Sequence, residues 1–321
     1  MIGFRENISF SLSPYHTRCK MKFLIYALLA AATLFQSAYA KEVKIQYNGL
    51  TLNGELLLAD GKTLKDGVVL FTHGTWMNNN YSTANTLKNL LPDSGVNLLA
   101  INLSFNVNDR HDEAILSCDR IHTHKHTDAI KEIGAWVKWL ESQGVHNITL
   151  AGHSRGGNQT AWYASEHNSD ANIKHIVLFA PQLWSKKGEI AEYKKRYHKD
   201  LAKLVAHADK LVKAGKGDEV MPHTDLLYCK DTKVTAASFA SYYDFNPNLD
   251  TIHLLPKIKK PVLVFAGTED DVVTDLPEKI EPVLKKHANI HLDVIDGATH
   301  FYRDFAGEDA VTKMVEFIGK K

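Results

Sequence analysis

The sequence predicts an α/β fold: a mostly parallel, twisted sheet of about eight strands, flanked by helices and interrupted by a helical lid insertion. Strand and helix patterns alternate along most of the chain, which is the order that gives a parallel sheet with helices on both faces. Residues 148–151 and 261–266 are continuous apolar runs, as expected for strands covered on both faces. Residues 128–142 carry apolar side chains at helical spacing on one face.

The elements follow one another in a regular order. An antiparallel hairpin is expected first, over 43–47 and 50–58, because Asn48-Gly49 is a strong two-residue turn signal. Further strands are expected at 67–72, 97–103, 147–151, 175–180, 261–266 and 290–295. Helices are expected near 82–91, 128–142 and 277–286, after the strand that ends at residue 151, and at the end of the chain.

One segment, from Pro181 to Pro256, lacks a clear strand pattern. Its apolar residues form a helical stripe instead, which ends at Gly215-Lys216-Gly217. The members of the stripe are Ile190, Tyr193, Tyr197, Leu201, Leu204, Ala208 and Leu211. We expect a helical lid over about residues 182–256, between the sixth and seventh strands. Its aromatic cluster either lines a cleft or packs the lid onto the core, and consists of Phe239, Tyr242, Tyr243 and Phe245.

The chemistry-bearing motif is Gly152-His153-Ser154-Arg155-Gly156, a G-x-S-x-G sequence between a predicted strand and a predicted helix. The glycines permit a strained corner that projects the serine hydroxyl, and the helix that follows directs backbone N–H groups toward a reacting group. Polar residues also follow two further predicted strands. Glu269, Asp270 and Asp271 come after strand 261–266, and His300 comes after strand 290–295. The order Ser, Asp, His is that of one particular class of hydrolase.

With the His73-Gly74 turn after strand 67–72, these features make the chain similar to the α/β-hydrolase superfamily, from about residue 42 to residue 319. The resemblance implies that Ser154 is a nucleophile, that His300 is its general base and that Asp270 orients His300. Asp270 is preferred over Asp271 and Glu269 because the family has its acid three residues after the glycine, here Gly267.

The resemblance also implies an oxyanion hole. Its backbone N–H donors are expected on Arg155, directly after the nucleophile, and on Thr75, with Trp76 as an alternative to Thr75. His73 is expected to brace this turn without taking part in the chemistry. No cofactor and no metal are expected at the site.

The N-terminus resembles a secretory signal peptide. Lys20 and Lys22 precede an apolar run over 23–32, and Ala38-Tyr39-Ala40 fits a cleavage site, so the mature chain is expected to begin at Lys41 and to be secreted or periplasmic in a bacterium. Met21 would be a suitable start, which makes residues 1–20 an upstream extension; a retained anchor is the alternative. The 281 residues of 41–321 fit one α/β-hydrolase domain, with no membrane span after cleavage.

Charge and cysteines add two expectations. Residues 1–40 carry four basic residues and one acidic residue, so the net charge of +1 becomes 1 − 3 = −2 in the mature chain. This balance gives no case for nucleic acid as a partner. Cys118 and Cys229 remain as an even pair in an oxidising compartment, where they form either a disulfide or two free buried thiols.

The loop 104–127 is unusual because His122, His124 and His126 alternate, as ligands on one face of an extended segment would. A metal site would need a further ligand, which is not evident. The preferred interpretation is a polar loop on the rim of the site, with Arg110 or Arg120 available to an anionic substrate group.

Taken together, the residues predict a serine hydrolase that cleaves a small-molecule carboxylic ester through an acyl-enzyme on Ser154. Three alternatives stay open. These are a peptidase or amidase with the same residues, a catalytically silent binding protein of the same fold, and a metal-binding protein that uses the histidine loop.

Overall fold

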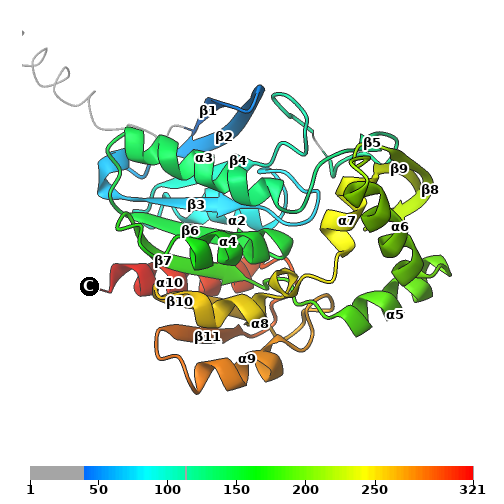
Figure 1. Cartoon of the computed structure of the whole chain (residues 1–321). Coiled ribbons are helices and arrows are strands. Elements are labelled where there is room, and N and C mark those ends of the chain that lie inside the picture. The colour runs from blue at the N-terminus through cyan, green and yellow to red at the C-terminus, as the bar shows by residue number, and fades with distance from the viewer. Residues whose placement is uncertain (1–39, 113, 321) are drawn as a thin grey trace, which may run out of the picture. The chain divides into compact units, whose positions relative to one another are not determined.

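The computed structural model describes residues 40–112 and 114–320 (Figure 1). Its central sheet has eight strands in the order β1-β2-β4-β3-β6-β7-β10-β11. Their bounds are Ala40–Tyr47 (β1), Leu50–Leu57 (β2), Val68–Thr72 (β3), Leu98–Asn102 (β4), Ile148–His153 (β6), Ile173–Phe179 (β7), Val262–Gly267 (β10) and Ile290–Ile295 (β11). Strands β1, β2 and β4 pair antiparallel and the other neighbours pair parallel, which confirms the predicted sheet.

Helices cover both faces of this sheet (Figure 1). On one face lie α2 (Thr83–Leu90) and α10 (Asp304–Gly319), and on the other lie α3 (Asp128–Ser142), α4 (Arg155–Glu166) and α9 (Leu276–Leu284). The period of two in β3 divides its side chains between these layers. Val68 and Leu70 belong to the core under α3 and α4, whereas Val69 and Phe71 belong to the core under α2 and α10.

The N-terminal hairpin forms where the turn signal predicted it. Asn48 and Gly49 have φ values of 48° and 79°, so both turn residues are left-handed and match the twist of the paired strands. Tyr47 faces Leu50 across the turn, and Ala40 faces Leu57 at the far end. Lys41, the predicted first residue after cleavage, is part of β1. Of the predicted signal peptide and extension, Ala40 is the first residue of β1, and residues 1–39 lie outside the described residues.

The insertion after β7 differs from the expected all-helical lid. It contains α5 (Lys186–Tyr197), α6 (Leu201–Lys213), α7 (Ala236–Tyr243), η2 (Pro247–Leu249), α8 (Thr251–Leu254) and η3 (Leu255–Lys257), but also a hairpin of β8 (Val220–Leu226) and β9 (Cys229–Thr235). This hairpin joins β5 (Ile121–His122) in a second sheet of order β5-β9-β8. The expectation of no strand between Pro181 and Pro256 is therefore wrong.

The sequence pattern did not predict this hairpin, because β8 and β9 are rich in polar residues and their apolar alternation is weak. Their pairing is also irregular in register. The long helical stripe is also divided in two. His198 has a left-handed backbone (φ 58°) and ends α5, and α6 starts after Asp200, whose side chain accepts a hydrogen bond from the backbone N–H of Lys203.

A disulfide between Cys118 and Cys229 confirms the predicted pairing, with 5.3 Å between the Cα atoms. It joins the segment before β5 to the first residue of β9, and Thr232 reinforces the junction by donating a hydrogen bond from Oγ1 to the carbonyl of Cys118 (2.7 Å). Within the described part of the chain, no helix combines the length and apolar character needed to cross a membrane.

Candidate active site

Ser154 lies at a strained corner between β6 and α4. Its φ and ψ of 55° and −122° fall outside the regions that non-glycine residues normally adopt. The flanking glycines make the corner possible. A Cβ on Gly152 would collide with the side chain of Thr160 and the carbonyl of Gly156, and a Cβ on Gly156 would collide with the carbonyls of Thr72 and His73. Strain of this kind is held in place by the packed strand and helix, and it occurs at functional sites.

A hydrogen-bonded pair lies at the ends of β10 and β11. Nδ1 of His300 is 2.9 Å from Oδ2 of Asp270, and both side chains are buried. The other oxygen of Asp270 accepts the backbone N–H groups of Val272 and Val273, each at 2.8 Å. Glu269 and Asp271 are exposed, so Asp270 is the carboxylate of this loop that the structure brings to His300.

The environment keeps Asp270 ionised. Burial acts to raise the pKa of its carboxyl, but the hydrogen bonds from His300 and from the two backbone N–H groups outweigh burial and lower the pKa below its ordinary value. A carboxylate that accepts from Nδ1–H of His300 fixes the imidazole in the tautomer whose Nε2 carries the lone pair.

His153, the residue before Ser154, connects the serine corner to His300. Its Nε2–H donates to the carbonyl of His300 at 2.8 Å, and the two rings lie 4.7 Å apart. This contact brings the loop of His300 against the corner. Among the described residues, the hydroxyl of Ser154 makes no hydrogen bond, to His300 or to any other group. Sequence reasoning missed the role of His153, although its position inside the G-x-S-x-G motif could have suggested it.

The turn after β3 lies against the same corner. A Cβ on Gly74 would be 3.3 Å from Cβ of Ser154 and 3.1 Å from Nδ1 of His153. The backbone N–H groups of Thr75 and Trp76 donate to no acceptor in the described part of the chain. Arg155 is the first residue of α4, so its N–H has no intrahelical acceptor. The oxyanion hole built from these N–H groups stays a prediction.

His73 braces this turn, as expected. Its Nδ1–H donates to the carbonyl of Gly74 (3.0 Å), and its Nε2 accepts the N–H of Leu103 (3.1 Å). Burial, followed by the charge of Arg110, lowers the pKa of His73 to about 3, so the ring is neutral at ordinary pH. With both nitrogens occupied and its ring buried, His73 holds the turn in position.

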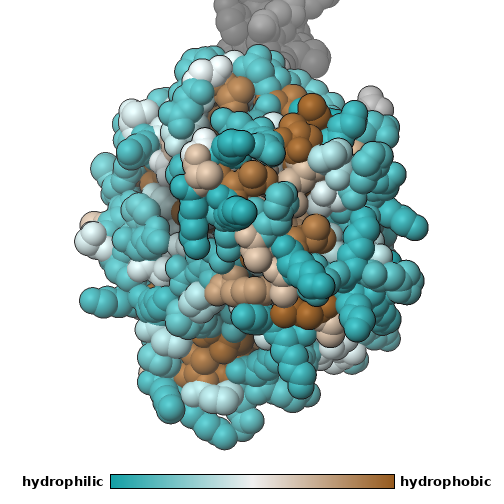
Figure 2. Space-filling view, turned by 45° about the vertical axis from the view of Figure 1, so that its right-hand side comes forward, coloured by the Kyte–Doolittle hydropathy of each residue, from teal (hydrophilic) through white to brown (hydrophobic). Residues whose placement is uncertain are grey.

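A cavity of about 350 Å³ opens beside Ser154. Thr75, Ser154 and Arg155 line it from the core, and α5 and the β8–β9 turn line it from the insertion. Much of its wall is polar or aromatic, with Glu189, Glu192, Tyr193, Arg196, Tyr197, Tyr228, Tyr243, Asp275 and Lys279 among the lining residues. Figure 2 brings the side of the insertion forward, and hydrophilic side chains cover most of that face, with hydrophobic ones in small separate groups.

The aromatic residues of the insertion were expected either to line the cleft or to pack the insertion onto the core, and both roles are observed. Tyr243 lines the cavity and accepts the N–H of Leu227 at its hydroxyl (2.7 Å). Phe239 is buried against Tyr243 inside the insertion, whereas Tyr242 is buried against His124 and His126 outside it. Phe245 lies against Trp184, with 6.4 Å between ring centroids. For most of the cluster, packing is therefore the observed role.

The expectation of a polar rim loop is wrong for its histidines. His122, His124 and His126 belong to residues 114–127, which we call the strap, and all three are buried. His122 stacks on Trp76 with 4.9 Å between ring centroids, and Nδ1 of His124 lies 2.8 Å from the hydroxyl of Tyr242. The strap thus packs between the Trp76 turn and the insertion, through the stacking on Trp76 and the contact with Tyr242.

Arg110 is likewise unavailable to a substrate. Its guanidinium is buried, donates from Nε to the carbonyl of Leu103 (2.7 Å) and forms an ion pair with Asp112 (2.9 Å). Arg120 is not among the residues that line the cavity. Three other cationic side chains line the cavity, namely Arg155, Arg196 and Lys279. Of these, Arg155 follows the serine directly within the G-x-S-x-G motif.

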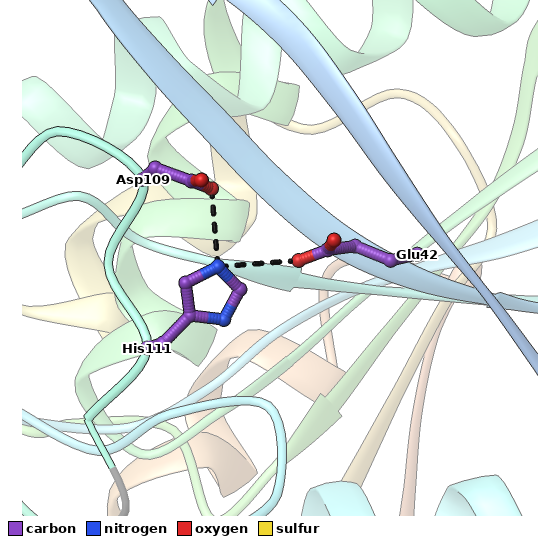
Figure 3. Close-up of side chains that lie close together, drawn as sticks. All are labelled: Glu42, Asp109 and His111. Carbon is purple, nitrogen blue, oxygen red and sulfur yellow. Dashed lines mark hydrogen bonds and ion pairs between the residues drawn. The ribbon is translucent and has the colours of Figure 1, made fainter.

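The three strap histidines do not form a group of metal ligands. Among the described residues, the one group of three metal-ligand side chains is Glu42, Asp109 and His111, on the surface near β1 (Figure 3). The ammonium of Lys44 already pairs with Asp109 at 2.6 Å and with Glu42 at 3.3 Å. A cation already occupies these carboxylates, so the group is explained as a surface ion-pair network.

Comparisons with known proteins agree with this fold. Residues 124–320 match the family described as "Protein of unknown function (DUF1749)". No curated protein matches the chain. Among solved structures, Est1E from Butyrivibrio proteoclasticus is similar at 19% identity and a TM-score of 0.58, over 88% of this chain and 100% of that one.

Two further solved structures are similar over most of their length. The monoacylglycerol lipase of Paleococcus ferrophilus has 19% identity and a TM-score of 0.55, over 87% of this chain and 98% of that one. The α/β hydrolase GrgF from Penicillium has 14% identity and a TM-score of 0.62, over 87% and 98%. At these identities the likeness concerns the fold, and it confirms the α/β-hydrolase fold that the sequence predicted.

Proposed function

The chain belongs to the DUF1749 family of proteins of unknown function, and for this member we propose a serine hydrolase that cleaves small carboxylic esters. The observation that carries the proposal is the buried hydrogen bond of 2.9 Å between His300 and Asp270, in a loop whose His300 carbonyl contacts His153, the residue before Ser154. A buried imidazole–carboxylate pair next to a projecting serine is the arrangement that activates a hydroxyl for acyl transfer.

The reaction follows from the tautomer of His300. Because Nδ1–H is donated to Asp270, Nε2 can take the proton of Ser154 as Oγ attacks the carbonyl carbon of the ester. The N–H groups of Arg155 and Thr75 stabilise the oxyanion of the tetrahedral intermediate. His300 then returns the proton to the leaving alcohol, and a water activated by the same imidazole releases the acid and restores Ser154.

The cleft supports a small and rather polar ester. A volume of about 350 Å³ is at the lower end of cavities that hold small molecules. Its wall carries carboxylates, cations and tyrosine hydroxyls, and Figure 2 shows no broad hydrophobic face on the side of the insertion. Short acyl groups suit this cleft better than long aliphatic chains.

The test is labelling of the protein with a fluorophosphonate, a reagent for activated serines. Wild type is expected to label and to hydrolyse a 4-nitrophenyl ester. Ser154→Ala is expected to lose labelling and roughly 10⁶-fold in kcat, with an unchanged melting temperature. Ser165→Ala, on the same helix but outside the cavity, is the matched control and should keep both activities.

The same experiment separates the alternatives. Labelling that persists in Ser154→Ala would refute the assignment of the nucleophile. A wild-type protein that binds esters but neither labels nor turns them over would be a silent binding protein. Matched anilides, cleaved faster than the esters, would make the enzyme an amidase.

We also propose that the protein is secreted or periplasmic and is cleaved before Lys41. The disulfide between Cys118 and Cys229 supports the proposal, because such bonds persist in oxidising compartments. N-terminal sequencing of protein from the periplasm or medium of an expressing bacterium should give Lys41 as the first residue. Full-length protein that stays in the cytoplasm would contradict the proposal.

A further inference from the structure

Arg155 carries a guanidinium into the cleft, and its side-chain partners are neutral. Nε donates to Oγ1 of Thr75 at 3.1 Å, and Nη1 lies 3.3 Å from Nδ1 of His126. The guanidinium also stacks over the ring of Tyr242, at 5.3 Å from its centroid. In the described part of the chain, no carboxylate lies within ion-pair distance of Arg155. These contacts use two of its five N–H donors.

His126 is held as a neutral acceptor. The amide nitrogen of Asn158 donates to the carbonyl of Asn248 (3.1 Å) and to Oγ1 of Thr251 (3.3 Å), so its oxygen faces His126 and accepts Nε2–H at 3.1 Å. Nδ1 therefore carries the lone pair that faces Arg155. Burial, followed by the charge of Arg155, lowers the pKa of His126 to about 3. The network orients the guanidinium without neutralising it.

The other cations of the cleft already have partners. Arg196 pairs with Glu192 at 2.9 Å, and Lys279 pairs with Asp275 at 2.7 Å. These pairs join residues on successive turns, on α5 and at the start of α9, and each pair carries no net charge.

Glu189 is the remaining carboxyl of the cleft wall, and it does not serve as the partner of Arg155. Burial raises its pKa above the ordinary value even though Arg155 acts to lower it. In the described part of the chain, Arg155 and Glu189 share neither a hydrogen bond nor an ion pair. Arg155 therefore has no direct carboxylate partner beside the nucleophile, and an anionic group of a ligand would supply one.

We propose that Arg155 binds an anionic group of the substrate, and that the enzyme acts on short esters that carry a carboxylate. The proposal rests on the proposed function and adds the substrate class. Arg155 follows Ser154 directly, and both line the same cavity, so a carboxylate held by the free N–H groups belongs to the molecule whose ester reaches Ser154. A planar guanidinium with donors in a fork suits bidentate binding of a carboxylate.

The experiment compares esters whose carboxylate is either free or blocked as a methyl ester. One pair is 3-acetoxybenzoate and its methyl ester, with the charge on the alcohol side; the other is mono-4-nitrophenyl adipate and its methyl ester, with the charge on the acyl side. Wild type is expected to favour the carboxylate member of at least one pair in kcat/KM. Arg155→Met should reduce this ratio by about 10- to 150-fold, the loss expected for a charge-assisted hydrogen-bonded pair. Arg155→Lys should keep part of the ratio, since it retains charge without the fork.

Arg196→Met is the matched control, because its guanidinium also lines the cleft but is already paired with Glu192, and it should change the ratio less than threefold. A purely structural brace would reduce kcat/KM for both members of a pair and leave their ratio constant. A second measurement needs no variant. In wild type, raising NaCl from 20 to 500 mM should lower kcat/KM for the carboxylate member and not for its methyl ester.

Two outcomes would overturn the proposal in distinguishable ways. Wild type that labels with fluorophosphonate and hydrolyses the neutral esters, but shows no preference for either carboxylate member, refutes the role of Arg155 and leaves the hydrolase intact. Wild type that neither labels nor hydrolyses any of the four esters refutes the proposed function and this inference with it. If Arg155→Met fails to fold, the salt dependence of wild type decides.

Discussion

The serine corner and the insertion are built by different means. At the corner, close backbone contacts fix each position: Gly152 and Gly156 have no room for a side chain, and His153 connects the corner to His300. The insertion is attached by side chains and by a covalent bond, through the disulfide and through the strap. Chemistry at the corner therefore depends on backbone geometry, whereas the shape of the cleft wall depends on contacts that tolerate more variation.

The strap is where the two regions meet. Ser238 of α7 donates to the carbonyl of His124, and His126 lies beside Arg155. Trp76, next to the expected oxyanion donor Thr75, stacks on His122. A change in the insertion can thus affect the turn beside Ser154 through the three alternating histidines of the strap, without a change in the central sheet.

The largest expected effect in this comparison concerns the acid of the corner. Asp270→Asn should reduce kcat about 10⁴-fold, because an amide at this position no longer holds His300 in the tautomer that accepts a proton. Asp271→Asn is the matched control, since this neighbour is exposed, and should cost less than threefold. Steady-state kinetics on a 4-nitrophenyl ester measure both. The reverse pattern would move the acid to Asp271.

Removing the disulfide tests the attachment of the insertion. The bond closes a separation of 111 residues, for which chain entropy gives a stabilisation of about 4 to 5 kcal/mol as an upper value. Cys118→Ala/Cys229→Ala should lower the free energy of unfolding by up to that amount, as measured by urea denaturation. Limited proteolysis should cut the double variant first within the insertion. Equal stability of wild type and double variant would show that strap packing alone holds the insertion.

The serine corner could be predicted from the sequence to a greater extent than the insertion and the strap. Strand ends in a parallel sheet meet at one edge, so the order of the motifs predicts Ser154, Asp270 and His300 at the same edge of the sheet. The contact between His300 and Asp270 is observed. The pairing of Cys118 with Cys229 was predictable as an alternative because only two cysteines lie outside the predicted signal and extension.

The strap and the β8–β9 hairpin were not predictable in this way. Alternating histidines are typical of a solvated or metal-binding segment, and nothing local to His122 shows that Trp76 will stack on it. The hairpin depends on pairing with β5, where Ile121 pairs with Lys233 at a separation of 233 − 121 = 112 residues, and on the disulfide beside it. Long-range contacts of this kind decide structure where apolar periodicity is weak.

A smaller effect is expected from adding one methyl group in each region. Gly156→Ala should destabilise the protein by about 1 to 3 kcal/mol or more, because its Cβ would meet the carbonyls of Thr72 and His73, which the sheet holds rigidly. Gly188→Ala, on α5, would meet only Oγ of Ser185 at 2.9 Å, a side chain that can rotate. Thermal unfolding of the two variants should therefore differ clearly, and equal losses would contradict the distinction between the regions.

The smallest expected effect is the pH dependence contributed by one strap histidine. Burial, followed by the charge of Arg120, lowers the pKa of His122 from 6.5 to about 4. Between these values the unfolded chain binds more protons at this residue than the folded protein, so stability rises with pH across the window and is lost as pH falls below 6.5. The slope is at most about 1.4 kcal/mol per pH unit for one histidine. Glu132 acts with the opposite sign, because burial raises its pKa to about 7, so only a difference between variants is diagnostic.

His122→Gln should therefore show a shallower decrease in unfolding free energy than wild type between pH 6.5 and pH 4, by up to that slope. Urea denaturation at half-unit steps measures the difference, and the range from pH 7.5 to 8.5 is the control, where His122 contributes no slope in either state. Parallel curves across the acidic range would mean that the imidazole stacked on Trp76 takes up its proton without leaving the fold, and that the contact between strap and turn withstands acid better than its burial suggests.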